Sequence, residues 1–492
     1  MTFRTSLFAA CLFAFTLSLG LCVSRAQEEP QQPPPENPQQ PAPDTPYEPF
    51  PQAPPKPAGS AFPAFEIGGE GELQPDFSPL TGMQNTTLGF PEMRHSYWVP
   101  GAQFSSNINS NPSGTNGNTN WTNTNYFVGN VSLLEAWSRA TMAVNYSGGG
   151  YVSNISGQGS GHYEELALAQ NYRSERWLIQ VVDRFSYIPQ SSFGFGGGTG
   201  LGIPGVGGSL GTTIPSLGGN YIPNQTIYGV GAFYNNVGAL QGTYALSRRA
   251  SVTISGSYGI LRFVNSGNSD SNTTVGSIGY NYALSRNDTV GFVYRFSSYQ
   301  YPGNPQAYGD HVFSVAYGRK ITGRIGLRLF AGPEITEYRV PVGGSSRKTG
   351  FSTSATMTYG LENGNFTLGY IHGLSGGSGV LVGSILDQAN ATFSHKLTRA
   401  WTGSLNFGYA RNGPLGGTAN TGYPAYDDYF FGGNVARPIG RFLNFAAAYT
   451  ATRGSYAGYA SGCTGIGCSG TTQTTNTFTI NLQWHPRPFV FR

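Results

Sequence analysis

Histidines and cysteines are the residues with which this chain could do chemistry, and both are few. None of the histidines belongs to a His-Glu-x-x-His zinc motif or lies near a Gly-x-Ser-x-Gly nucleophile motif. Because catalytic groups can also come from distant strands, His372 with a serine of a neighbouring strand is the one candidate for a hydrolase site. We therefore predict that the chain is not an enzyme and uses no cofactor or metal. The histidines are His95, His162, His311, His372, His395 and His485.

The glycine run 193–198 could be taken for a phosphate-binding loop, but it matches only in glycine content. A P-loop needs a Lys-Ser or Lys-Thr pair and a helix directly after the glycines, and neither follows here. The net charge of +4 is small and scattered, which argues against a nucleic-acid partner. The residues that carry chemistry therefore indicate no site by themselves.

The composition indicates one repetitive structure. Charged residues make up 11% of the chain, against about a quarter in ordinary globular proteins, while glycine reaches 71 residues. A soluble surface with so few charges is hard to build. A membrane barrel has an apolar outer wall and tolerates an uncharged polar inner wall, so it fits this composition. No apolar run of eighteen residues follows the N-terminus, which excludes membrane-spanning helices.

A short polar turn, usually with an arginine, recurs along the chain between runs of alternating residues. In 251–261, for example, apolar side chains such as Ile254 alternate with small polar ones such as Ser255. Period two indicates strands, and although soluble sandwiches also alternate, their wet face normally carries Lys and Glu rather than Ser, Thr and Asn. The eight turns are 137–140, 174–176, 246–249, 284–288, 321–324, 363–365, 397–400 and 439–441.

The turns predict an all-β fold, an antiparallel up-and-down transmembrane β-barrel of about 18 strands in the bacterial outer membrane. A strand at 97–109, broken by Pro100 and Gly101, and one at 475–485 complete the even number. The paired strands are 125–137/140–152, 162–173/177–190, 235–247/250–264, 273–285/288–300, 311–321/325–338, 351–362/366–378, 386–398/401–413 and 428–439/442–456. Short turns should face the periplasm and long loops the exterior.

Four parts follow one another along the chain. Residues 1–26 read as a signal peptide, with Arg4, an apolar core and a small-residue cleavage site. Residues 27–60 form a disordered Pro/Gln-rich periplasmic linker. Residues 61–96 are irregular and lie either in the periplasm or in the barrel lumen. The outer-membrane barrel occupies 97–492.

Two long loops carry separate expectations. The Gly-rich loop 191–232 holds no charged residue, and it either folds into the lumen or stays on the surface. Cys463 and Cys468 lie in the last long loop, and in an exported protein such a close pair is expected to form a disulfide.

Alternation places four cations on the polar face, where they are pore-lining candidates: Arg184, Arg295, Arg328 and Lys396. They either give the lumen a mild anion preference or pair with inward acids such as Glu334. The same register puts Asp183, Glu135 and Arg319 on the lipid face.

The Ala-Leu-Ser-Arg turns, the strands 255–259 and 279–284 and the Gly-rich loop resemble uncharacterised porin-like outer-membrane β-barrel proteins of Gram-negative bacteria. The resemblance covers 97–492 and implies assembly by the outer-membrane insertion machinery. Such proteins usually end in phenylalanine, whereas this chain ends Phe491-Arg492 behind Pro486 and Pro488.

We predict a porin-like outer-membrane channel for passive diffusion of small polar solutes. The alternatives are a structural or surface-display barrel without an open pore, and an outer-membrane hydrolase. Expected partners are outer-membrane lipid, the insertion machinery and a peptidoglycan or periplasmic partner reached through the Pro-rich tether, and a homo-oligomer is a further option.

Overall fold

The computed structural model describes residues 80–81, 96–110, 121–154, 159–188, 232–264, 269–304, 306–340, 344–376, 383–415, 425–456 and 471–491. They belong to one compact unit, 62–492, and the other unit, 1–61, lies outside the described residues. The predicted signal peptide, the Pro/Gln-rich linker, the body of the 191–232 loop and the Cys463–Cys468 pair also lie outside them.

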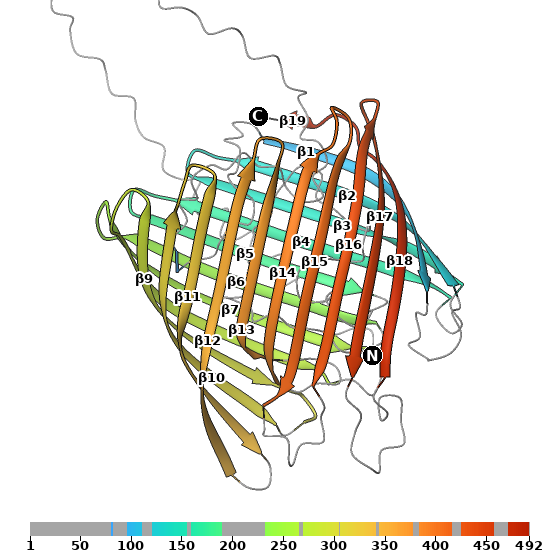
Figure 1. The fold of residues 1–492 in the computed structure, drawn as a ribbon. Helices are drawn as coiled ribbons and strands as arrows, with labels where there is room; N and C mark the ends of the chain where they lie inside the picture. The colour runs from blue at the N-terminus through green and yellow to red at the C-terminus, as the bar shows by residue number, and fades with distance from the viewer. Residues whose placement is uncertain are drawn as a thin grey trace, which may run out of the picture. The chain divides into compact units, whose positions relative to one another are not determined.

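The described residues form one closed antiparallel sheet in which each strand from β1 to β17 pairs with the next along the chain (Figure 1). The strands are β1 (Ser96–Ser110), β2 (Trp121–Ala136), β3 (Ala140–Ser153), β4 (Ser160–Arg173), β5 (Trp177–Ile188), β6 (Phe233–Ala245), β7 (Ala250–Phe263), β8 (Ser271–Ala283), β9 (Asp288–Gln300), β10 (Ala307–Lys320), β11 (Ile325–Val340), β12 (Gly344–Leu361), β13 (Gly364–Ser375), β14 (Ser384–Lys396), β15 (Thr402–Pro414), β16 (Tyr426–Ile439), β17 (Leu443–Tyr456), β18 (Thr471–Trp484) and β19 (Phe489–Phe491). The predicted all-β barrel is confirmed.

Closure depends on the first strand, which pairs with β2 on one edge and with both β18 and β19 on the other. β19 continues the line of β18 after Pro486 and Pro488, whose missing N–H groups cannot join a ladder. Counting β18 and β19 as one interrupted strand gives eighteen. The predicted first strand is therefore present despite Pro100, and the last strand begins earlier than predicted.

All eight predicted turns join the strands that they were expected to join. Four of them close by the same device, in which the hydroxyl of the second residue accepts backbone N–H groups two and three positions later. Ser285 Oγ, for example, accepts from Asn287 and Asp288 at 3.0 Å each. Such hydroxyl turns satisfy donors that the ladder leaves unpaired. Ser247, Thr322 and Thr398 act alike.

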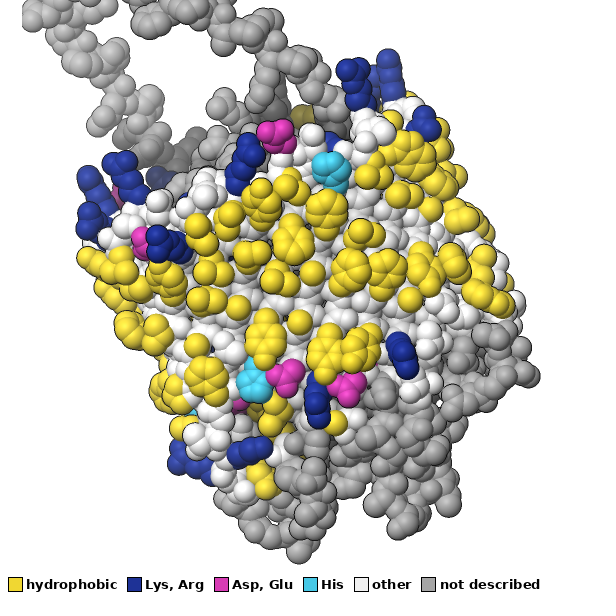
Figure 2. Space-filling view, in the orientation of Figure 1, with side chains coloured by type: hydrophobic (Ala, Val, Ile, Leu, Met, Phe, Trp, Pro, Cys, Tyr) yellow, Lys and Arg dark blue, Asp and Glu magenta, His cyan; other side chains and the backbone are white. Residues whose placement is uncertain are grey.

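Burial is inverted relative to a soluble protein. On β7, the side chains of Thr253 and Ser255 are 1% and 7% exposed, whereas those of Ile254 and Tyr258 are 58% and 47% exposed. Apolar side chains spread over the outer wall in Figure 2, while charged ones gather toward the two ends of the strands. The predicted assignment of the apolar face to the outside is confirmed.

The described residues include no helix that is long and apolar enough to cross a membrane.

Candidate functional site: the inner wall of the barrel

The five residues proposed as pore lining all stand on the inner face. Arg184 alternates with the buried Gln180 and Val182 on β5, and Arg295 precedes the buried Ser297 and Tyr299 on β9. Arg328 and Glu334 share the inner face of β11, and Lys396 has the inner parity of β14 at the short-turn end. Period two alone therefore placed each of them on the polar face.

One inner-wall ion pair joins β4 and β5. The guanidinium of Arg184 donates from Nε and Nη2 to Glu165 Oε1 at 3.2 and 2.8 Å. The other carboxylate oxygen accepts the hydroxyl of Tyr163, which is buried, at 2.7 Å. The carboxylate of Glu165 thus accepts two hydrogen bonds from the guanidinium and one from a hydroxyl, and such charge-assisted hydrogen bonds are strong. Glu165 and Tyr163 were not foreseen, because a partner on the next strand depends on the cross-strand register.

A second pair joins β9 and β10. Arg295 Nη2 lies 3.5 Å from Asp310 Oδ2, and Asp310 is fully buried. On the neighbouring β11, Glu334 Oε1 accepts the backbone N–H of Leu374 at 2.9 Å. Two of the four candidate cations thus form ion pairs with acids on a neighbouring strand of the inner wall. This favours the pairing alternative over a wall of uncompensated positive charge.

Two residues of the irregular segment 61–96, Leu80 and Thr81, lie against this inner wall near the short-turn end. The amide N–H of Thr81 donates to Asn281 Oδ1 at 2.8 Å, and Asn281 Nδ2 donates back to Thr81 Oγ1 at 2.7 Å. Leu80 packs against Ala316, Phe330 and Val293. We call this contact the lumen dock.

Glycines make room for the lumen dock on three adjacent strands. A Cβ at Gly279 would lie 2.4 Å from Thr81 Oγ1, and one at Gly291 would lie 2.8 Å from Thr81 Cγ2. A Cβ at Gly318 would reach Leu80 Cδ1 at 3.0 Å. The signal in the sequence was a set of inward-facing glycines, but only the register shows that they are neighbours.

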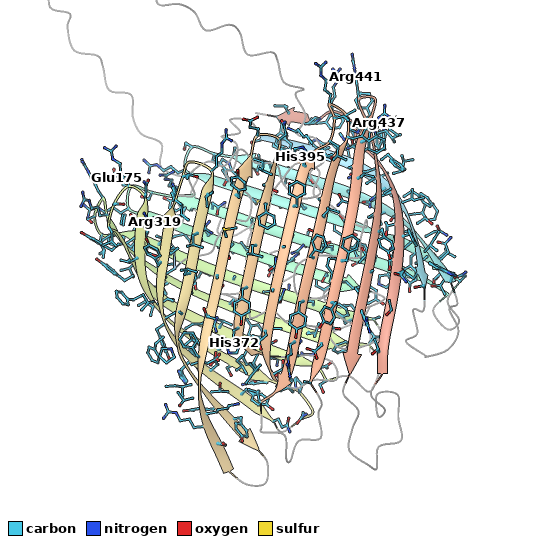
Figure 3. All side chains as sticks on the ribbon, in the orientation of Figure 1. Glu175, Arg319, His372, His395, Arg437 and Arg441 are labelled. Carbon is cyan, nitrogen blue, oxygen red and sulfur yellow. The ribbon has the colours of Figure 1, made fainter. Side chains whose placement is uncertain are left out.

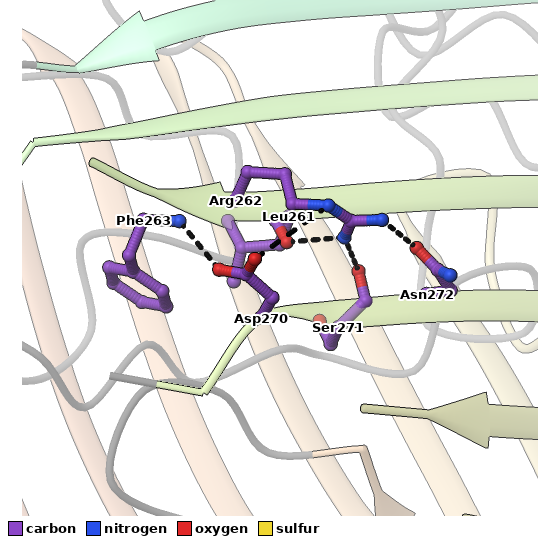
Figure 4. Close-up of polar contacts among 6 residues, drawn as sticks. All are labelled: Leu261, Arg262, Phe263, Asp270, Ser271 and Asn272. Atoms are coloured by element: carbon purple, nitrogen blue, oxygen red, sulfur yellow. Dashed lines mark hydrogen bonds and ion pairs between the residues drawn. The ribbon is translucent and has the colours of Figure 1, made fainter. Parts of the chain in front are cut away.

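Several charged residues on the outer wall also have polar partners. Asp183 accepts a hydrogen bond from Asn236 Nδ2 at 3.2 Å, and Arg319 Nε lies 3.7 Å from Asp288 Oδ1. The alternation along their strands places Asp183, Arg319 and Glu135 on the outer face, as predicted. At the long-loop end, Arg262 bonds the carbonyl of Ser271 and the side chain of Asn272 and faces Asp270 (Figure 4).

His372, the one hydrolase candidate, lies away from the short-turn residues Glu175, Arg319 and Arg441 (Figure 3). Its ring Nδ1 is 2.6 Å from Asp387 Oδ1 on the outer wall. The neighbouring serine, Ser352, donates to the backbone carbonyl of His372 and not to its ring. This arrangement gives no serine nucleophile activated by His372.

Comparison with known proteins gives similarity of structure only. No protein-family model matches this chain, and no curated protein matches it. Among solved structures, it is similar to OprD of Pseudomonas aeruginosa (11% identity, 84% of this chain and 99% of the other, TM-score 0.37). It is also similar to OpdK of P. aeruginosa with vanillate (10%, 82% and 100%, 0.42) and to OccAB3 of Acinetobacter baumannii (7%, 80% and 99%, 0.39). The chain is thus similar to outer-membrane β-barrel proteins at low identity.

Proposed function

We propose that this protein is an outer-membrane channel through which small polar solutes diffuse passively. The observation that carries the proposal is the inverted burial of a closed eighteen-strand barrel, polar inside and apolar outside. An apolar outer wall without an open edge is what a lipid bilayer requires of strands. A barrel of sixteen to eighteen strands is wide enough for an aqueous path unless it is plugged.

The chemistry of the inner wall supports diffusion more than tight binding. Many of its buried residues are Ser, Thr, Asn and Gln, which exchange weak hydrogen bonds with water and solutes, and they stand among apolar ones such as Val182 and Tyr299. Its charges include two cation–acid pairs, which hold the net field in the lumen low. A solute would meet many weak donors and acceptors and few strong ones.

The proposal also covers the N-terminal segments, the turns and the inner-wall residues. Residues 1–26 direct export, 27–60 tether the barrel in the periplasm toward peptidoglycan or a periplasmic partner, and the insertion machinery places the barrel in the membrane. The short turns, with their arginines, face the periplasm. Pore-lining roles for Arg184, Arg295, Arg328, Lys396 and Glu334, a Cys463–Cys468 disulfide and a homo-oligomer belong to the same proposal.

Purified full-length protein in a planar lipid bilayer tests the channel. We expect stable, stepwise conductance that scales with salt concentration, because ions should cross a water-filled lumen. Liposome swelling with sugars of graded size then gives the solute range. A bilayer that stays silent with protein shown to be folded by its electrophoretic mobility contradicts the proposal.

A barrel without an open pore is the second candidate, and the lumen dock is the observation that favours it. Leu80 and Thr81 occupy part of the inner wall, so the chain itself narrows the path. This candidate would be favoured if the native chain gave no conductance in the bilayer and a variant with a disrupted lumen dock gave conductance steps.

A further inference from the structure

Three rows of side chains cross the outer wall of β13 to β17 at the long-loop end. The deepest row is apolar, the next is mostly tyrosine, and the outermost is charged, following the cross-strand register. The rows are Leu368–Ala391–Phe407–Phe431–Ala451, then Tyr370–Ala389–Tyr409–Tyr429–Arg453, then His372–Asp387–Arg411–Asp427. In Figure 2 the charged row lies along the edge of the apolar band.

A groove of about 480 Å³ runs over the apolar row and the tyrosine row of the outer wall. Alanines such as Ala389, Ala391 and Ala451 leave low points in it. Between them stand two ring pairs, Phe407 with Phe431 and Tyr409 with Tyr429, each with centroids 5.1 Å apart. The lining is thus apolar and carries rigid aromatic ridges, which suits a hydrocarbon chain.

Arg453 gives this groove a positive end. The charged side chains of the outermost row pair with one another: His372 Nδ1 lies 2.6 Å from Asp387 Oδ1, and Arg411 Nε lies 4.0 Å from Asp427 Oδ1. Arg453 lies one row deeper, among the tyrosines, is exposed, and makes no ion pair with any described residue. A guanidinium at the level of the aromatic girdle can reach the lipid headgroups, where an anion can pair with it.

We propose that this groove binds one anionic lipid, with an acyl chain along the alanines and its phosphate on Arg453. The fork of a guanidinium matches phosphate oxygens, and the tyrosine hydroxyls mark the level where headgroups begin. The proposal rests on the membrane placement given above but not on an open pore. It therefore stands or falls separately from conductance.

Native mass spectrometry of the full-length protein, released from micelles with added dipalmitoyl phosphatidate or dipalmitoyl phosphatidylcholine, tests it. We expect phosphatidate to bind tighter, and Arg453→Gln to weaken phosphatidate alone by about tenfold, the effect of one charge-assisted hydrogen bond. Arg453→Lys should keep most of the preference. Arg437→Gln is the matched control, since Arg437 is also on the outer wall but at the short-turn end, over Trp401.

The groove is tested by filling it. Ala391→Trp should weaken both lipids, whereas Ala447→Trp, on the outer face but outside the groove, should weaken neither. Inorganic phosphate should not displace phosphatidate, because it has no chain to bury. Equal losses from Arg453→Gln and Arg437→Gln, or displacement by phosphate alone, would overturn the proposal.

Discussion

Asp183 is a charged side chain on the mainly apolar outer wall of the barrel. It lies on the outer face of β5, between Ile179 and Tyr187 of the same face, and Asn236 is its hydrogen-bond donor. A carboxylate at this depth in lipid is unfavourable, although less so than a lysine or arginine. The amide of asparagine could keep the contact with Asn236 without the charge.

We therefore expect Asp183→Asn to raise the free energy of unfolding from lipid vesicles by about 1 kcal/mol. Asp288→Asn is the matched change at the short-turn end. It should lower stability, because Asp288 accepts from Ser285 and Tyr317 and faces Arg319. Urea titration followed by tryptophan fluorescence measures both. A loss of stability in Asp183→Asn as large as in Asp288→Asn would contradict this account.

The elements of this barrel differ in what positions them. Each hairpin is closed locally by its own turn, so the strand order follows the chain. The lumen dock is different, because Thr81 and Asn281 are 200 residues apart in sequence. Its glycines on β8, β9 and β10 serve a contact that no local pattern explains.

We expect Gly279→Val to expel Leu80 and Thr81, since its Cβ alone would lie 2.4 Å from Thr81 Oγ1. Single-channel conductance should then rise, because part of the lumen is vacated. Gly276→Val is the matched control on the same strand, where a Cβ meets nothing within 4 Å.

Leu80→Asp tests the lumen dock from its other side, since it leaves the wall intact and removes the apolar contact with Ala316 and Phe330. Conductance should rise here too. If both Gly279→Val and Leu80→Asp behave like Gly276→Val, the dock does not limit the path.

At the scale of the whole molecule, the balance of inner-wall charges should set ion preference. Arg184→Gln removes the arginine partner of Glu165, so the reversal potential in a salt gradient should move toward cation preference. Glu165→Gln should move it toward anions by a similar amount. Arg262→Gln, whose side chain lies on the outer face at the rim, should leave it unchanged. An equal shift from Arg184→Gln and Arg262→Gln would show that lumen charge is not the cause.

Much of the architecture follows from the sequence, because it depends on local rules. Period two separates Ile254 from Ser255 whatever the partner strands are, and the serine hydroxyl of a turn such as 284–288 acts within four residues. Hence the turns, the faces and the inner position of Arg184 and Arg295 could be predicted without a structure. The strand count followed from them.

Only the tertiary structure decided which residues meet. The ion pairs Glu165–Arg184 and Asp310–Arg295, which are diagonal between neighbouring strands, and the place of Arg453 in the tyrosine row all depend on the register between strands. The closure of β1 on β18 and the lumen dock bring together residues far apart in the chain. A repeat of period two gives each side chain its face but not its height in the barrel, and contact depends on that height.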